Sequence, residues 1–235
     1  MDREAVAHRL HSATLVVDSH NDSIVAHLRR RGLSIAGPGA PRRDNPPSAA
    51  ASLREPLDDD AGVQLNLPNL RAGSIDVAYF SVDVTRPWGN HLLYAVDALG
   101  WFRAEVQAHS DAIAITVSAD GIEAAHRSGK AAAVLAVENS EVLERSLYVL
   151  PQLHRLGVRS ITLTWSYRTE AADGVLEADT GGGLTDFGRA LVATMNELGM
   201  LVDISHLSEA GFWDVIDSSA APILASHNCC RTLCD

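Results

Sequence analysis

Short apolar runs alternate with segments of helical spacing along most of this chain, and this alternation constrains the fold more than any other feature. The runs are rich in Val, Ile, Leu and Ala and lack interleaved polar residues, which is typical of parallel strands covered on both faces. They predict strands over Thr14–Val17, Ile75–Val82, Ala131–Val137, Ser160–Thr164, Met200–Ile204 and Pro222–Ala225. A further run, Ala112–Val117, predicts a minor strand or the end of a helix.

Helices are predicted between these runs from apolar spacing and from capping residues such as Gly157 and Gly199. The expected segments are His91–Ser110, Ala119–Ser128, Ser140–Leu156 with a break at Pro151, Asp186–Leu198 and Ser208–Ser218. Strands that alternate with helices predict a parallel α/β fold, as a doubly wound sheet or a (β/α)8 barrel. Neither GxGxxG nor GxxxxGK[ST] follows a strand, which disfavours the nucleotide-binding versions.

The stretch 30–69 interrupts this pattern with six prolines, several glycines and two charge clusters. It predicts an irregular insertion loop, which is either a lid or binding segment or a flexible connection. With 235 residues and 46% hydrophobic composition, the chain as a whole suits a single globular domain over 1–235.

Composition excludes several classes of protein. The net charge of −11 gives no electrostatic footprint for nucleic acid or for anionic lipid. The longest apolar run, Ala131–Val137, is far shorter than the roughly 20 residues of a bilayer span, so we expect no transmembrane segment. The polar N-terminal sequence lacks the apolar core of a secretory signal, and the three cysteines, all near the end, form no complete disulfide set. These features predict a cytoplasmic protein.

Four of the apolar runs lead directly into residues of the types that bind metals. They precede His20 and Asp22, Glu138, His206, and His227 respectively. Active sites of parallel α/β folds form where strands end, so these side chains are expected to converge. Their mixture of nitrogen and oxygen donors suits Zn²⁺, with other first-row divalent ions as alternatives.

Ordinary structural roles compete with this interpretation at each single position. A histidine at a strand end commonly makes a hydrogen bond, and Glu138 could cap the segment that follows it. The terminal CCRTLCD, with Cys229, Cys230 and Cys234, suggests a separate zinc site with His227, but it lacks the second ligand pair that structural sites have. The agreement of four strand ends favours one shared centre.

The sequence around these residues resembles the membrane (renal) dipeptidase family, which are metallopeptidases of the amidohydrolase type. The resemblance extends over nearly the whole chain, in the family's order. It rests on DSHND at 18–22, LNLPNLRAGSIDVAYFSV at 65–82, AVEN at 136–139, LHRLGVRSITLTW at 153–165, GLTDFGRALVATMNELGMLVDISHLS at 183–208 and APILASHN at 221–228.

This resemblance implies a (β/α)8 barrel that hydrolyses small dipeptides with two zinc ions and a bridging hydroxide as nucleophile. His20 and Asp22 would bind the first ion, His206 and His227 the second, and Glu138 would bridge both. Asp18 and Asp203 are candidate acceptors that hold the ligands, or they make ordinary strand-end hydrogen bonds. By the same resemblance Trp165 would line the substrate pocket, at a catalytic position where many members of the family carry a histidine.

The chain departs from the family in a second way, because only six principal strands are predicted before Asp235 and the barrel needs eight. The family's proton-transfer Asp and the Arg for the substrate carboxylate have no counterpart. We therefore expect a C-terminally incomplete dipeptidase, whose open sheet edges would favour a homo-oligomer. The rival hypotheses are a non-catalytic metal-binding scaffold or fragment, and a related amidohydrolase that acts on another small amide.

Overall fold

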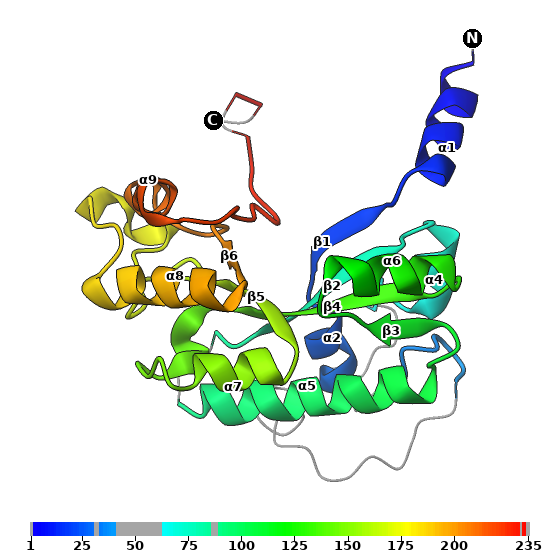
Figure 1. Ribbon diagram of the computed structural model, residues 1–235, viewed down its shortest axis with the longest axis horizontal. Helices are drawn as coiled ribbons and strands as arrows, with labels where there is room; N and C mark the ends of the chain where they lie inside the picture. Colours follow the sequence, from blue (N-terminus) through cyan, green and yellow to red (C-terminus); the bar gives the residue numbers. More distant parts are fainter. Residues whose placement is uncertain (1, 31–32, 41–62, 86–88, 231, 234–235) are drawn as a thin grey trace. The chain divides into compact units, whose positions relative to one another are not determined.

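The computed structural model describes residues 2–30, 33–40, 63–85, 89–230 and 232–233, and these residues form an α/β fold with a six-stranded parallel sheet (Figure 1). The strand order is β1-β2-β4-β5-β6, and β3 pairs with β4. The strands are β1 (Val17–Asn21), β2 (Val77–Asp83), β3 (Ile113–Ile115), β4 (Ala131–Glu138), β5 (Val158–Thr162) and β6 (Leu201–Asp203).

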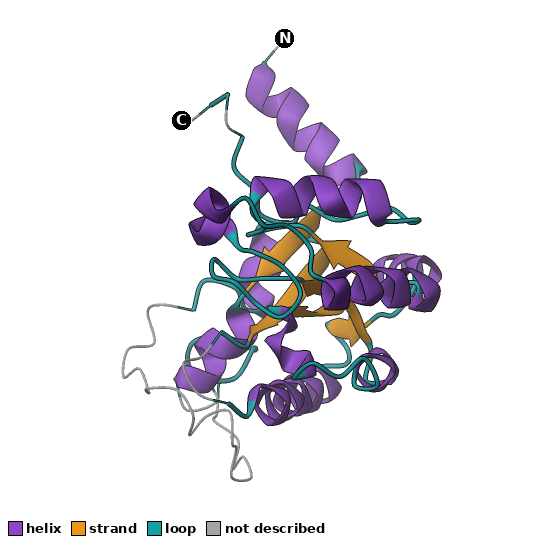
Figure 2. Cartoon of the chain, turned by 90° about the vertical axis from the view of Figure 1, so that its left-hand side faces the viewer, coloured by secondary structure: helices purple, strands orange, loops and turns teal. Residues whose placement is uncertain are grey.

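The strands, orange in Figure 2, are connected mostly by helices, drawn in purple, as the sequence alternation predicts. The α-helices are α1 (Arg3–Ala13), α2 (Ser23–Arg29), α4 (Leu67–Ala72), α5 (His91–Ala108), α6 (Ala119–Arg127), α7 (Leu150–Arg155), α8 (Asp186–Leu198) and α9 (Glu209–Ser218). Two 3-10 helices, η1 (Ser140–Leu143) and η2 (Val175–Thr180), follow β4 and β5. Among the helices of the described ranges, none has the length and apolar character that a bilayer crossing requires.

Contacts divide the chain into two compact units. Unit 1 comprises Met1–Ser81 and Asp97–Val134, and unit 2 comprises Val82–Val96 and Leu135–Asp235. In unit 1, β1 pairs with β2 and β3 pairs with β4, both in parallel. The apolar side chains that pack together there include Val77, Ala125, Ala132 and Val134. Helix α1 contributes no buried side chain to the core. Its N-terminus is stabilised locally by the N-cap Asp2, whose side chain accepts from the Glu4 amide.

In unit 2, β4, β5 and β6 pair in parallel, and helices α7 and α8 pack against β5 and β6. Helix α8 begins behind the N-cap Thr185, whose hydroxyl accepts from the Gly188 amide, and ends at Gly199 with φ +68°. The predicted and observed bounds of α8 agree, and at its C-terminal end the signal was the capping residue Gly199.

Several predicted elements differ from the structure. Strand β1 begins at Val17 rather than Thr14, since α1 extends to Ala13, and it continues through polar residues that pair with β2. The predicted strand Pro222–Ala225 makes only an isolated bridge between Leu224 and Asp203. Pro151 lies in the first turn of α7 instead of breaking a longer helix.

The predicted helix over 140–156 is interrupted earlier, where Glu144 and Arg145 have positive φ angles and end η1. Within the predicted irregular stretch 30–69, residues 33–40 and 63–66 have no regular secondary structure, and α4 begins at Leu67. Residues 31–32 and 41–62 of that stretch lie outside the described residues. The assignment of one domain over 1–235 stays a prediction.

His27 on α2 is a buried polar residue that ties two distant segments of unit 1 together. Its Nδ1 lies 2.6 Å from the Leu33 carbonyl oxygen and its Nε2 lies 3.2 Å from that of Leu65. Burial lowers the pKa of His27 below its usual value, while the two carbonyl groups and Glu105 act in the opposite direction and Arg30 adds to the lowering. The neutral imidazole is therefore the form that the folded unit favours.

We expect the free energy of unfolding to fall as the pH drops from about 7 to about 5. The unfolded chain binds a proton at its higher pKa, near 6.5, whereas folded His27 resists protonation until a lower pH. Each unit by which the two pKa values differ contributes about 1.4 kcal/mol. Urea denaturation of His27→Gln across this range should show a flatter pH dependence. The matched variant His8→Gln, on exposed α1, should keep the dependence of the parent protein, and equal slopes for all three proteins would contradict the assignment to His27.

Candidate metal centre

Three predicted ligands converge in unit 2. Glu138 is the last residue of β4 and is only 3% exposed. Its Oε1 lies 2.9 Å from His206 Nε2 and 3.6 Å from His227 Nε2, and the two Nε2 atoms are 2.8 Å apart. A carboxylate oxygen and two imidazole nitrogens thus face a common point, although they come from segments far apart in the sequence.

This arrangement fits a divalent cation. An unprotonated imidazole nitrogen and an ionised carboxylate oxygen each carry a lone pair and can only accept hydrogen bonds, so packing three such atoms together favours a positive charge between them. Atoms that bind zinc at roughly 2.0–2.2 Å in tetrahedral geometry lie about 3.4 Å from one another. The observed separations of 2.8, 2.9 and 3.6 Å bracket that value.

His206 is held by the loops that follow β5 and β6. Its backbone has φ +68°, an unusual conformation for a residue other than glycine, and its carbonyl oxygen accepts from the Val175 amide at 2.8 Å. The ring lies beside the indole of Trp165, with centroids 5.8 Å apart, and its Nδ1 lies 3.4 Å from Ser166 Oγ. These contacts turn Nε2 toward Glu138.

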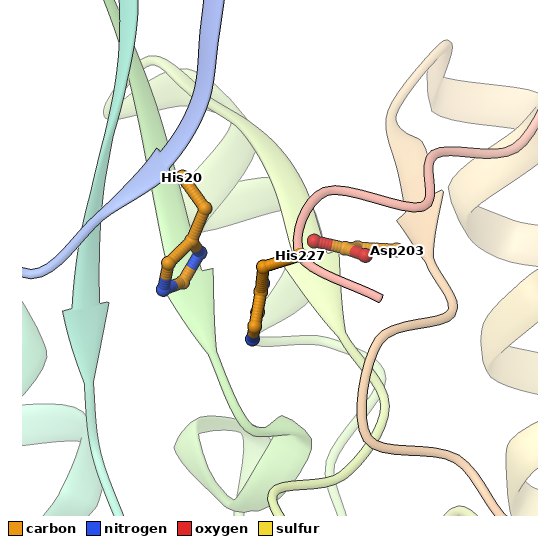
Figure 3. Close-up of side chains that lie close together, drawn as sticks. All are labelled: His20, Asp203 and His227. Carbon is orange, nitrogen blue, oxygen red and sulfur yellow. The ribbon is translucent and has the colours of Figure 1, made fainter. Parts of the chain in front are cut away.

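His227 lies in the segment that follows the isolated bridge at Leu224. Figure 3 shows the Asp203 carboxylate, at the end of β6, turned toward the loop that carries His227. Asp203 accepts from the amide and the hydroxyl of Ser226, the residue before His227. Ser226 Oγ in turn lies 2.7 Å from His227 Nδ1. Asp203, a candidate acceptor that supports the ligands, is thus linked to the His227 ring through Ser226.

The other two predicted ligands lie in unit 1. His20 is within β1, and Asp22 is the residue immediately before α2, with His20 Nε2 and Asp22 Oδ1 3.7 Å apart. Asn21 between them donates to Asp18 Oδ2 at 3.1 Å and to the Tyr79 carbonyl oxygen at 2.9 Å. Asp18 therefore helps to hold the side chain of Asn21, at the end of β1 between the two candidate ligands. That the His20–Asp22 pair completes a centre with Glu138 stays a prediction.

Two cavities of unit 2 adjoin residues of this cluster or its neighbours. One, of about 660 Å³, is lined by His206 and His227 together with apolar side chains that include Phe212 and Trp213. The other, of about 290 Å³, is lined by Trp165 with Thr85, Asn139, Glu141, Tyr167, Arg168 and Thr169. Trp165 thus lines a cavity and lies beside one candidate ligand, and its role toward a substrate stays a prediction.

The loop that carries Trp165 is fixed by an ion pair between a buried carboxylate and an exposed guanidinium group. Arg168 donates from both its Nε and Nη2 to Asp173, whose side chain is 6% exposed, and Thr180 donates to the same carboxylate. The hydrogen bond from Arg168 is the main reason that the pKa of Asp173 lies below its usual range. This ionised pair anchors the segment between β5 and α8.

Sequence reasoning missed the serines at 166, 205 and 226 and the strained Asn139 that follows Glu138 with φ +86°. Their positions directly before or near candidate ligands were the available signal. The suggested cysteine site gains no support among the described residues, since Cys229 and Cys230 are exposed and free and join no metal-compatible group. Cys234 lies outside the described residues.

Comparison with known proteins supports the resemblance seen in the sequence. A family model described as membrane dipeptidase (peptidase family M19) matches residues 4–235. The chain is 34% identical to Dipeptidase tcpJ of Claviceps purpurea (strain 20.1) over 185 residues, which are 74% of this chain and 43% of that protein. It is 31% identical to Dipeptidase 3 of Mus musculus over 179 residues, 73% of this chain and 36% of that protein. The chain thus spans about two fifths of the length of these relatives.

Solved structures of metallopeptidases resemble this chain in fold. The crystal structure of a dipeptidase AC, described as a metallopeptidase, matches with a TM-score of 0.74 and 27% identity over 91% of this chain and 63% of that chain. A metallopeptidase from Rhodobacter sphaeroides, liganded with a phosphinate mimic of the dipeptide L-Ala-D-Ala, matches with a TM-score of 0.74 and 26% identity over 91% and 65% of the two chains. These likenesses confirm the predicted fold class, an incomplete (β/α)8 type of which the described residues form six strands.

Proposed function

Because the chain belongs to the membrane dipeptidase family, peptidase family M19, we propose that it takes part in metal-dependent hydrolysis of dipeptides. The observation that carries this proposal is the convergence of Glu138, His206 and His227 on one point at the strand ends of unit 2. The dipeptide mimic bound to the Rhodobacter sphaeroides neighbour supports the class of substrate.

We extend the proposal to two zinc ions, with His20 and Asp22 on one, His206 and His227 on the other, and Glu138 on both. Such ions, when bound, would lower the pKa of a shared water molecule and polarise the amide carbonyl group. Glu138 supplies a charge whose burial raises its affinity for a cation, since it has little competing solvent. The two histidines bind as neutral imidazoles.

Trp165 is the residue of this chain that we propose to face the substrate. Its indole N–H is a hydrogen-bond donor, and its ring lies beside the His206 imidazole, with the two centroids 5.8 Å apart. The apolar cavity beside His206 and His227 offers room for a side chain of a dipeptide, with Phe212 and Trp213 as its aromatic lining. The chain's own residues thus bind the cation and orient a small substrate.

A metal analysis beside a dipeptide hydrolysis assay tests this function. About two equivalents of zinc together with hydrolysis would support the enzyme. Zinc without hydrolysis of any dipeptide would favour the non-catalytic scaffold, and hydrolysis of another small amide in place of dipeptides would favour the related amidohydrolase. Protein that binds no zinc at micromolar concentration would contradict the proposed centre itself.

Trp165→His should raise hydrolysis, because an imidazole can donate a hydrogen bond and also transfer a proton, whereas indole can only donate. General acid–base groups contribute about 10²–10⁴-fold, so we expect a gain of at least about 10-fold in kcat. Tyr167→His, which places the same side chain on the neighbouring residue, is the matched control and should give no gain. A Trp165→His protein with full zinc content and unchanged kcat would show that this position does not limit the reaction.

A further inference from the structure

Asp203 is a buried carboxylate that accepts hydrogen bonds from two serine hydroxyl groups. The residue is only 3% exposed. Its Oδ1 accepts from the amide of Ser205 at 3.0 Å and from the hydroxyl of Ser205 at 2.8 Å, and its Oδ2 accepts from the hydroxyl of Ser226. An ionised carboxylate can only accept hydrogen bonds, so both hydroxyl protons point toward Asp203.

The same two hydroxyl oxygens face His227. The His227 amide donates to Ser205 Oγ at 3.2 Å, and its ring Nδ1 lies 2.7 Å from Ser226 Oγ. A hydroxyl group has one proton, and the proton of Ser226 is directed at Asp203. The Ser226 oxygen must therefore accept a hydrogen bond from Nδ1–H of His227. The two hydroxyl oxygens also lie 3.1 Å apart, and the shorter distances to Asp203 assign both protons to the carboxylate.

We propose that Asp203, through Ser226 and Ser205, is a positioning device that holds His227 in the tautomer with its proton on Nδ1. The unprotonated Nε2 then points at Glu138 and His206, where a cation would bind. This proposal rests on the metal centre proposed above. Only an unprotonated nitrogen binds a metal, and a hydrogen bond at the other ring nitrogen fixes both the tautomer and the ring orientation.

The backbone around His227 explains why such a device is needed. The segment from Pro222 makes only an isolated bridge to β6, through Leu224, so the sheet alone does not fix the residues that follow. The Asp203 carboxylate accepts from the backbone and side chain of Ser226, and Ser205 accepts from the backbone of His227. One buried anion at the end of β6 therefore orients both the chain and the ring of the ligand.

NMR of the ¹⁵N-labelled metal-free protein tests the proposal without any assay of activity. Long-range ¹H–¹⁵N correlations of the His227 ring should show the proton on Nδ1 in the parent protein. Ser226→Ala removes the acceptor, so the ring should shift toward the Nε2-protonated tautomer that free histidine prefers. Zinc affinity, measured by competition with a chromophoric chelator, should weaken by about 10–100-fold.

Two further variants make the test specific. Ser226→Thr keeps a hydroxyl group and should restore both the Nδ1 proton and most of the zinc affinity. Ser218→Ala removes an exposed serine hydroxyl of α9, which donates to the Asp214 carbonyl oxygen of the same helix, and should change neither. The proposal is overturned if Ser226→Ala keeps the parent tautomer, or if Ser226→Thr is as weak as Ser226→Ala. Failure of the proposed function appears differently, as a parent protein with the expected tautomer that binds no zinc or hydrolyses no dipeptide.

Discussion

Glu138→Ala should abolish measurable dipeptide hydrolysis and lower the zinc content at both proposed positions, because this carboxylate is proposed to touch both ions. Metal ions contribute several kcal/mol to stabilisation of the transition state in such reactions, which corresponds to a loss of about 10³-fold or more in kcat/KM. His206→Ala should mainly empty one position. Zinc determined by atomic absorption after dialysis, beside steady-state kinetics, measures both effects.

The metal-free Glu138→Ala protein should be as stable as the parent or more stable. Glu138 is 3% exposed and its Oε1 faces two imidazoles, so without a cation its ionised form is costly to bury. Equal or higher thermal midpoints would show that lost activity does not result from unfolding. Glu197→Ala, an exposed glutamate on α8, is the matched control and should keep zinc and activity. An unchanged zinc stoichiometry in Glu138→Ala would falsify the bridging role.

Gly188→Ala should destabilise unit 2 by at least about 3 kcal/mol, at the upper end of the usual cost of overpacking. A Cβ atom at Gly188 would lie 2.0 Å from the Ala171 carbonyl oxygen and 2.9 Å from its carbon. These are backbone atoms, and the same carbonyl oxygen accepts from the amide of Thr185, the N-cap of α8, at 2.9 Å. The clash would therefore push the start of α8 away from the loop that carries Ala171.

Urea denaturation followed by circular dichroism measures this effect as a lower transition midpoint. Gly100→Ala is the matched control, since a Cβ atom on that residue of α5 meets no atom within 4 Å. There the substitution should be neutral or stabilise the helix by about 0.5–1 kcal/mol. Equal midpoints for Gly188→Ala and Gly100→Ala would contradict the close approach of α8 to Ala171.

The strand ends that carry ligands were predictable where an apolar run is long and stops abruptly. Ala131–Glu138 is such a run, and its last residue is the buried carboxylate. Helix α8, whose C-terminal cap Gly199 can be read from the sequence, was predicted at its observed bounds. Helices α1 and α2 were missed because the first carries no buried side chain and the second is short.

The hydrogen bonds that orient the ligands could not be predicted from the sequence. Asp203 and Ser226 are separated by 23 positions and meet only because Leu224 pairs with the end of β6. The geometry of such contacts depends on tertiary packing, which leaves no periodic pattern. The strand predicted at Pro222–Ala225 failed for a related reason: an apolar run predicts burial, but a strand needs several consecutive residues paired with a neighbour, and here Leu224 makes an isolated bridge to Asp203.

The left-handed backbone at His206 disfavours the residue type that the proposed metal centre requires there. With φ +68°, this position would be occupied with less strain by glycine or asparagine, neither of which offers an imidazole. Substitutions chosen for folding alone would therefore tend to replace this candidate ligand, and screens for thermostable variants should exclude the position from their libraries.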